Sequence, residues 1–389
     1  MKRHGKTLGA GLGLALLLLA GCSGSEASGM TATASVGPEN SLSFNDLEGW
    51  SSGGQALSLG AFRRSCTRIL KLNHDDLLDP KTGNALYGEA GDWRAACAAA
   101  AGVGPGDEAA RRYFESHFIP VSLAAEGSGK SLFTGYYEPE MKGALHRGGV
   151  YQTPIIGFPP EFAAARRAGK TLPTRSEIED MLARGELDPG LALVWLADPV
   201  DAFFLHVQGS GRVALEDGRT VRLAFAAKNE RPYTSIGKLL IEDGAIPRDE
   251  VSMQTIRAWL ESHPDAVRPL LRRNDSYIFF KMLTADPSLG PPGAEQVNLT
   301  PQRSLAVDRS LHPLGALFWL DTTAPTPHRA GEEPFRQLMV AQDTGTAIRG
   351  LQRGDVFWGP GAEAADIAGR MKQPGELIAL LPRNLVAGR

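Results

Sequence analysis

The chain has 389 residues, of which 42% are hydrophobic, and its 41 basic and 44 acidic side chains give a formal net charge of −3. This length and hydrophobic content predict a folded protein of about two domains. The charges are spread along the chain rather than collected in runs, which argues against nucleic acid as a partner.

The first 21 residues have the organisation of a secretory signal peptide. Basic residues near the start precede an apolar stretch over residues 8–20, which is too short to span a bilayer comfortably. The stretch ends in Leu19-Ala20-Gly21-Cys22, which resembles a bacterial lipobox whose cysteine becomes the lipidated first residue. Ser23 follows Cys22, whereas in the sorting pattern that this resembles an aspartate retains lipoproteins in the inner membrane. We therefore expect an outer membrane lipoprotein that faces the periplasm and is anchored through Cys22.

Residues 22–41 are rich in Ser, Gly, Thr and Ala, which predicts a flexible tether. From about residue 42 to 118, apolar residues at three-and-four spacing predict helices, among them 57–72, 92–101 and 108–114. Cys66 and Cys97 lie in the first two of these helices. In an oxidising compartment they can form one disulfide, and two buried unpaired thiols are the alternative.

Beyond residue 131 the apolar period shortens towards two, and glycine and proline punctuate the pattern, which predicts short strands. The predicted strands of the middle region are 132–133, 150–151, 154–158, 191–196, 203–207 and 221–225. Helices are expected again between residues 235 and 280, with Ser252 as an N-cap. The last hundred residues predict strands at 304–307, 316–320, 338–341, 355–358 and 377–381, with one helix at about 362–371. The predicted fold is mainly β with α-helical segments.

Three aspartates lie beside apolar runs in the carboxyl-terminal region: Asp308, Asp343 and Asp355. Each alone is most simply a turn former or a cap. A carboxyl group held near Phe357 and Trp358 loses hydration, which raises its pKa, and a second aspartate nearby raises it further. A general acid that works near neutral pH needs such a shift. The histidines do not fall at metal-ligand spacing, and the motifs HExxH, GxSxG, GxGxxG and the Walker loop are absent, so we expect neither a metal nor a cofactor.

Five segments extend these observations over nearly all of the mature chain. They are Phe133-Thr134-Gly135-Tyr136-Tyr137-Glu138-Pro139, Val207-Gln208-Gly209-Ser210-Gly211-Arg212, residues 228–237, residues 274–280 and Leu299-Thr300-Pro301. In this order they resemble the membrane-bound lytic murein transglycosylase A family. The family's module of three aspartates matches Asp308, Asp343 and Asp355.

The resemblance implies a discontinuous catalytic domain with a double-psi β-barrel, formed by residues 42–135 and 287–389. The carboxyl-terminal part would be the three-aspartate module. A second β-barrel domain, residues 136–286, would be inserted between the two parts. Glycan would lie in the groove between the two domains.

The resemblance also implies an activity and its residues. The family cleaves the β-1,4 bond between N-acetylmuramic acid and N-acetylglucosamine in peptidoglycan and leaves a 1,6-anhydro end. The family's single acid/base matches Asp355, and Asp343 and Asp308 would support it.

Groove candidates are polar or aromatic side chains that can contact sugars: Thr134, Tyr136, Gln208, Ser210 and Lys228. Gln208 and Ser210 lie in a segment with Gly209 and Gly211, and the alternative explanation of this segment is that it only forms a turn. Glu230 stands where the family commonly has glycine, and we expect it to be a solvated turn residue.

Two other classes of protein fit parts of the sequence. A peptidoglycan-binding lipoprotein without catalytic activity would need the groove but no acid of raised pKa. Asp343-Thr344-Gly345 resembles the signature of aspartic proteases, but Gln342 precedes it in place of an apolar residue and no second such motif occurs. Product mass separates the classes, because an anhydro end makes the released fragment lighter by one water.

Overall fold

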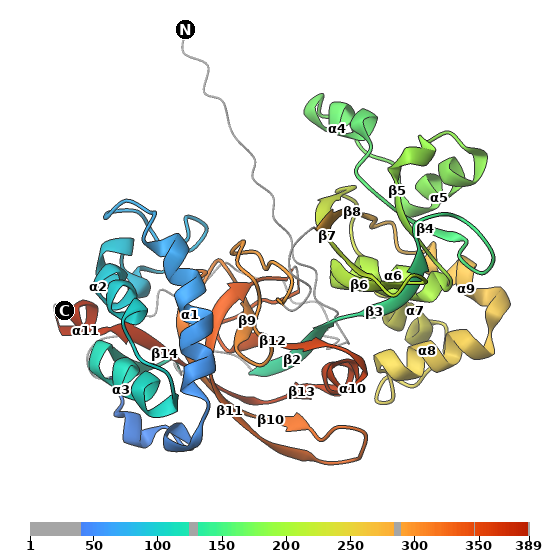
Figure 1. The fold of residues 1–389 in the computed structure, drawn as a ribbon. Coiled ribbons are helices and arrows are strands. Elements are labelled where there is room, and N and C mark those ends of the chain that lie inside the picture. The colour runs from blue at the N-terminus through green and yellow to red at the C-terminus, as the bar shows by residue number, and fades with distance from the viewer. Residues whose placement is uncertain (1–39, 124–130, 284–288, 346, 388–389) are drawn as a thin grey trace, which may run out of the picture.

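The computed structural model describes residues 40–123, 131–283, 289–345 and 347–387. Within these ranges the chain is a mixed α/β fold with two β-sheets and helices packed around them (Figure 1). No helix of the described ranges is long and apolar enough to cross a membrane. The predicted signal peptide, Cys22 and nearly all of the predicted tether lie outside the described residues.

The three amino-terminal helices that the sequence predicts are present, and they pack together on one side of the first sheet. They are α1 (Gln55–Ile69), α2 (Ala90–Ala101) and α3 (Asp107–His117). Each contributes a fully buried aromatic ring, and the rings of Phe62, Trp93 and Phe114 all contact Phe118. Cys66 of α1 and Cys97 of α2 form a disulfide, which decides between the two alternatives that the sequence left open.

The first sheet combines strands from both ends of the chain. In chain order its strands are β1 (Phe118–Ser122), β2 (Leu132–Glu138), β9 (Ser304–Val307), β10 (Leu317–Pro325), β11 (Glu332–Asp343), β12 (Arg353–Pro360), β13 (Lys372–Gln373) and β14 (Gly375–Pro382). Their order in the sheet is β1-β14-β10-β11-β9-β12-β2-β13. β1 pairs with β14 antiparallel and β2 pairs with β12 parallel, so the sheet brings together segments more than 200 residues apart. Helix α10 (Ala362–Arg370) packs on β2 and β12, and α11 (Arg383–Ala387) follows β14.

The second sheet is built from the middle of the chain. Its strands are β3 (Glu140–Ala144), β4 (Thr153–Ile156), β5 (Ala192–Leu196), β6 (Ser210–Leu215), β7 (Thr220–Lys228) and β8 (Ile278–Leu283), in the order β4-β5-β3-β6-β7-β8. The helices of this region are α4 (Pro160–Arg167), α5 (Arg175–Arg184), α6 (Pro199–Gln208), α7 (Ile236–Glu242), α8 (Met253–Ser262) and α9 (Pro264–Leu271). Among the described residues neither sheet closes on itself, because β1 and β13 are the edges of the first and β4 and β8 are the edges of the second.

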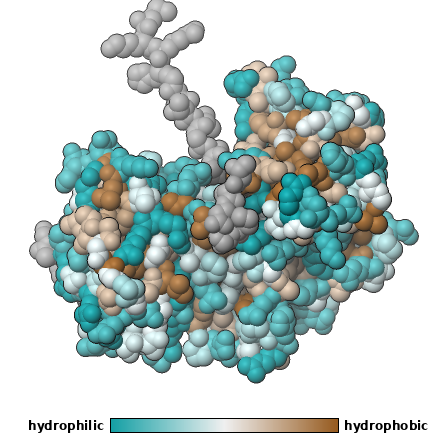
Figure 2. All heavy atoms as spheres, viewed as in Figure 1, coloured by the Kyte–Doolittle hydropathy of each residue, from teal (hydrophilic) through white to brown (hydrophobic). Residues whose placement is uncertain are grey.

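The chain passes directly from one sheet to the other where β2 runs into β3 (Figure 1). Glu138, the last residue of β2, is fully buried there and forms ion pairs with Arg212 of β6 at 2.8 Å and Arg222 of β7 at 2.7 Å. A buried carboxylate held by two guanidinium groups fixes the second sheet against the end of β2. The space-filling view is hollowed between the part that carries α1 to α3 and the part that carries α4 and α5 (Figure 2).

Parts of the strand prediction were wrong. Residues 203–207 lie in helix α6, whose first turn is capped by the Asp198 side chain accepting from the amide of Val200. Nearly every residue of α6 is buried, and a short apolar run looks the same in a buried helix and in a strand. Tyr151 makes only an isolated bridge with Gly148, and the region expected to be helical up to residue 280 ends in strand β8.

We predict that replacing both cysteines by serine destabilises the fold. The bond between Cys66 and Cys97 spans a separation of 31 residues, and removing a cross-link of this size costs about 2–4 kcal/mol of unfolding free energy. Urea unfolding of the wild type and of the Cys66→Ser/Cys97→Ser variant measures the loss. Reductant should lower the wild-type midpoint and leave the variant unchanged, and equal midpoints for both oxidised proteins would contradict the prediction.

Candidate active site

Two of the three aspartates meet across strand β9. Asp355 of β12 and Asp343 at the end of β11 both pair with Ala306, which lies on the strand between them. Residues directly opposite one another across neighbouring strands present their side chains on the same face of a sheet. The small side chain of Ala306 therefore leaves the two carboxyl groups room to approach each other. The sequence predicted a strand that begins at Asp355, but Asp355 lies inside β12, which begins at Arg353.

Asp355 is fully buried and is held by a chain of two hydrogen bonds. Arg353 Nη2 donates to Thr134 Oγ1 at 2.9 Å, and Thr134 Oγ1 donates to Asp355 Oδ1 at 2.6 Å. Arginine can only donate, so the threonine hydroxyl must accept from it and turn its own hydrogen towards the carboxyl group. Asp355 Oδ2, by contrast, is buried and has no hydrogen-bond partner among the described residues. Oδ2 is therefore the oxygen on which a proton can reside.

Burial raises the pKa of the Asp355 carboxyl group to about 6. The positive charge of Arg353 and the hydrogen bond from Thr134 oppose this shift, and the nearby charge of Asp343 adds to it. The desolvation of Asp355 that the sequence predicted is thus present. Of the two aromatic residues expected to cause it, Phe357 and Trp358, only Phe357 lies on the same face of the sheet as Asp355. The Phe357 ring contacts Tyr136, whereas Trp358 packs on the other face against Phe335.

Asp343 is fixed by three donors. Tyr136 Oη donates to Asp343 Oδ2 at 2.9 Å, and the backbone amides of Ala294 and Thr344 donate to Oδ1 at 3.0 and 2.9 Å. Burial raises the pKa of Asp343 despite these hydrogen bonds, and burial together with Asp343 raises the pKa of Tyr136 well above its ordinary value. Tyr136 therefore stays a neutral donor. Both carboxyl oxygens of Asp343 are occupied, which does not suit the water shared between two aspartates of an aspartic protease.

Asp308 has a different environment. It follows β9, and its carboxyl group accepts from the Ser310 hydroxyl at 2.7 Å and from the Gly350 amide at 3.0 Å. Burial raises the pKa of Asp308, but these hydrogen bonds and the charge of Arg349 outweigh it and hold the pKa below its ordinary value. No hydrogen bond joins its carboxyl group to Asp343 or Asp355 within the described ranges. Asp308 thus orders the turn after β9 and the loop that leads into β12.

A small cavity of about 80 Å³ lies where the two sheets meet. It brings together Tyr136 and Asp343 from the first sheet with Gln208 and Ser210, which flank the α6–β6 turn. The turn depends on Gly209, whose φ of +75° ends the helix. Gln208 Oε1 is buried without a hydrogen-bond partner among the described residues, so it can accept a hydrogen bond from a ligand.

The remaining predicted residues take other positions. Thr134 contacts Asp355 and does not line the cavity, and Lys228 is buried at the end of β7, outside the lining of the cavity. Glu230 is exposed with a φ of +60° and pairs with Arg166, as expected for a solvated turn residue. A positive φ also explains why glycine suits this position.

Three contributors to the site carry no signal in the sequence alone. Arg353 lies two residues before Asp355, on the same face of β12, but only the pairing of β12 with β2 brings Thr134 between them. The amide of Ala294 belongs to a loop with no strand pattern. Lys281 of β8 lines the cavity as well, and only its position opposite Ala224 in the second sheet reveals this.

Comparison with known proteins identifies the family. The family model described as the MltA specific insert domain matches residues 132–281, and the model described as the 3D domain matches residues 303–381. The chain is 36% identical over 259 residues to the membrane-bound lytic murein transglycosylase A of Escherichia coli K12, and the match covers 66% of this chain and 67% of that protein. This chain belongs to the membrane-bound lytic murein transglycosylase A family.

Solved structures of the family agree with this assignment. The membrane-bound lytic murein transglycosylase from Agrobacterium tumefaciens is 32% identical, with a TM-score of 0.76, and the match covers 90% of this chain and 99% of that chain. MltA from Neisseria gonorrhoeae in its monoclinic form is 30% identical, with a TM-score of 0.71 over 88% of this chain and 92% of that chain. E. coli MltA has been solved with bound chitohexaose; it is 30% identical, with a TM-score of 0.62 over 83% of this chain and 90% of that chain.

Clusters of His, Cys, Asp and Glu side chains show where a metal ion could bind. Within the described ranges, one group of side chains places three ligand atoms within 4.8 Å of one another: His74, Asp75 and Glu89, all exposed. Among the residues that the structure describes, Asp308, Asp343 and Asp355 belong to no such group. The buried partners of the two central aspartates are hydrogen-bond donors, which suits proton transfer.

We predict that Asp355→Asn makes the fold more stable at neutral pH. The pKa of Asp355 is about 6 in the folded protein against an ordinary value of 3.8, so the folded state binds its proton more tightly and wild-type stability falls as pH rises through this window. Well above pH 6 the variant should exceed the wild type by about 3 kcal/mol, and near pH 4 the difference should shrink to less than about 1 kcal/mol. Urea unfolding from pH 4 to pH 7 measures the difference, and a difference independent of pH would contradict the assigned pKa.

Proposed function

We propose that this chain is a lytic transglycosylase that cleaves peptidoglycan with Asp355 as its only acid/base. The observation that carries the proposal is the buried Asp355 carboxyl group, which has a pKa of about 6 and one oxygen without a partner among the described residues. Such a group is protonated often enough near neutral pH to act as an acid and is a competent base once it has lost its proton. The names of the relatives support the substrate class.

The proposed reaction needs no water and no protein nucleophile. Asp355 Oδ2 gives its proton to the glycosidic oxygen as the bond from C1 of N-acetylmuramic acid to that oxygen breaks. An oxocarbenium-like centre forms at C1. The C6 hydroxyl of the same sugar then bonds to C1 and gives its proton to Oδ2. The products are a free N-acetylglucosamine hydroxyl and a 1,6-anhydromuramic acid end, and Asp355 is again protonated.

The neighbouring residues would support each step. Thr134 and Arg353 hold Oδ1 in place, so that Oδ2 alone carries the proton in both steps. The negative charge of Asp343 would stabilise the developing positive charge at C1. Asp308 would act at a distance, by ordering the loop before β12 through the Gly350 amide.

Access to Asp355 requires movement. Asp355 has no exposed surface, and Tyr136 and Asp343, which interact with it electrostatically, line the small cavity where the sheets meet. A sugar could reach Oδ2 only after side chains that line this cavity shift. We propose that Tyr136, Gln208 and Ser210 contact the glycan there, and that Lys228 contacts it further along the second sheet. Hydroxyl and amide groups suit sugar hydroxyls and acetamido groups.

We also propose the domain organisation that the resemblance implies. Residues 42–135 and 287–389 would form the discontinuous catalytic domain with a double-psi β-barrel, and residues 136–286 the inserted domain. The parallel pairing of β2 with β12 supports the first part, since it joins the two chain segments in one sheet. The close approach of β4 and β8, the two edge strands of the second sheet, supports a barrel in the second part.

The activity is tested by the products of Asp355→Asn. This change keeps the size of the side chain but removes both proton steps, so release of anhydro-muropeptides from purified sacculi should fall by at least about 10⁴-fold. Asp343→Asn and Asp308→Asn should lose less, because their proposed roles are indirect.

Mass spectrometry of the released fragments and circular dichroism of each variant provide the controls. Fragments lighter by one water than hydrolytic products are expected from the wild type. Reducing ends would instead indicate a hydrolase, and no products at all would favour the non-catalytic binding protein. Near-wild-type release by Asp355→Asn would end the assignment of Asp355.

We propose that Cys22 carries the lipid anchor and that the protein faces the periplasm from the outer membrane. The basic start, the apolar stretch and the small residues before Cys22 support this. Cell fractionation of the wild type against Cys22→Ala provides the test. The wild type should sediment with outer membranes and the variant should not, whereas a variant that stays with the membranes would rule out the anchor.

A further inference from the structure

A second, much larger pocket lies on the inserted region, separate from the cavity beside Asp343. Its volume is about 840 Å³, within the range of about 300–1,000 Å³ that is usual for small-molecule sites. Helices α5, α6 and α9 and strands β4 and β5 line it, and it shares no lining residue with the small cavity. None of the residues to which the mechanism assigns a role lines this pocket.

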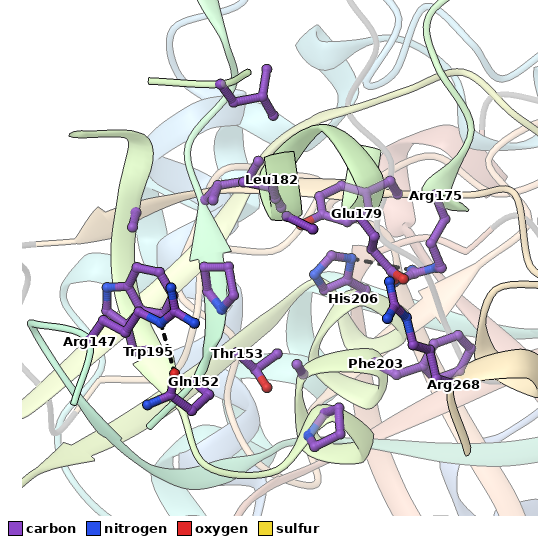
Figure 3. A pocket seen from close by; sticks show the side chains of 18 of the residues that line it. Arg147, Gln152, Thr153, Arg175, Glu179, Leu182, Trp195, Phe203, His206 and Arg268 are labelled. Carbon is purple, nitrogen blue, oxygen red and sulfur yellow. Dashed lines mark hydrogen bonds and ion pairs between the residues drawn. The ribbon is translucent and has the colours of Figure 1, made fainter. Parts of the chain in front are cut away.

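One side of the pocket carries an aromatic ring with polar neighbours. Trp195 of β5 is half-buried, and Arg147 and Gln152 lie beside it (Figure 3). Arg147 Nε donates to Gln152 Oε1 at 2.8 Å, and the Arg147 guanidinium lies 5.6 Å from the centre of the Trp195 ring. Both polar side chains are exposed and can rearrange around a ligand. An indole beside amide and guanidinium donors is suited to stacking with a sugar ring and bonding its hydroxyls.

The opposite side carries a buried donor and an acceptor. Arg175, Glu179 and His206 lie together there (Figure 3). His206 Nδ1 lies 3.3 Å from Arg175 Nη2 and 3.4 Å from the amide of Ile278, and both of these groups donate. His206 must therefore carry its hydrogen on Nε2, which has no hydrogen-bond partner among the described residues although the side chain is only 4% exposed. Burial and the charge of Arg175 lower the pKa of His206 well below its usual value, so the ring is neutral.

The charges around the pocket favour a neutral ligand. Arg175 pairs with Glu179 at 3.7 Å and Arg268 with Asp180 at 3.6 Å, and Arg184 pairs with Glu186. The His206 donor and the Glu179 acceptor match the carbonyl and the N–H of an amide, such as an acetamido group. The apolar lining side chains include Leu182, Leu187 and Val267, which suit an acetyl methyl group.

We propose that this pocket is a second glycan-binding site, which takes an acetamido-sugar segment of the polymer and holds it while another segment is cleaved. The sugar ring would stack on Trp195, and the acetamido group would reach His206 and Glu179. The choice of polymer rests on the proposed function. Helix α6 contributes His206 to this pocket and Gln208 to the cavity beside Asp343, so one buried helix holds the two sites at a fixed separation.

Calorimetric titration of the full chain with chitohexaose tests the proposal, in the Asp355→Asn background so that no turnover consumes the probe. Two classes of site are expected. Trp195→Ala should weaken one class at least about tenfold, as loss of a central aromatic contact does, and Gln208→Ala should weaken the other. Gln152→Ala, an exposed position, should weaken the same class as Trp195→Ala. Arg219→Ala is the matched control, because Arg219 is exposed, pairs with Asp217 and lines neither pocket.

Each outcome decides the matter. A single class that responds to Gln208→Ala but not to Trp195→Ala would overturn the second site and leave the proposed function intact. A single class that responds only to Trp195→Ala would support the second site and count against the proposed groove. Absence of binding would overturn both. Binding of a free stem tetrapeptide, but not of chitohexaose, at the Trp195-dependent site would overturn the glycan assignment.

Discussion

The placement of one carboxyl group in the interior of a sheet is the constraint on which the rest of the site depends. Asp355 lies inside β12, between β9 and β2, with no exposed surface. An ionised carboxyl group is strongly disfavoured in such surroundings, and the fold tolerates it by two means. It keeps the pKa near 6, so that the neutral form remains accessible, and it supplies Arg353 through Thr134 to steady the charged form. Together these opposing effects describe a group that can both give and take a proton.

The topology explains why two distant parts of the chain are needed. Thr134 is 221 residues from Asp355, yet the parallel pairing of β2 with β12 sets them side by side. The same strand ends in Glu138, whose ion pairs with Arg212 and Arg222 fix the second sheet. Thus β2 both orients the acid and connects the sheet whose α6–β6 turn supplies Gln208 and Ser210. A displacement of β2 would disturb both parts of the site together.

The desolvation of Asp355 could be predicted from sequence, because its signal is local: the aspartate lies beside Phe357. Gln208 and Ser210 were groove candidates beside the family resemblance, with turn formation around Gly209 as the alternative, and in the structure Gly209 ends α6 while both side chains line the cavity. The role of Arg353 could not be predicted, because it depends on a strand pairing that no local pattern specifies. The run 203–207 was misjudged as a strand for a related reason, since helix α6 is buried on nearly all sides and loses its amphipathic period. The different roles of Asp308 and Asp343 could not be predicted either, because they depend on hydrogen bonds that form only in the folded chain. Asp308 accepts from Ser310, whereas Asp343 accepts from Tyr136.

Direct titration of the Asp355 carboxyl group tests the central claim. Carbon-13 NMR of the protein labelled at aspartate side-chain carboxyl carbons, with Asp355→Asn to assign the signal, follows this one group across pH. We expect a signal that is lost in the variant and titrates with an apparent pKa near 6, together with a smaller coupled change at Asp343. A signal that titrates at the ordinary aspartate value of 3.8 would contradict the claim, since the carboxyl group would then be ionised throughout the neutral range and could not act as the acid.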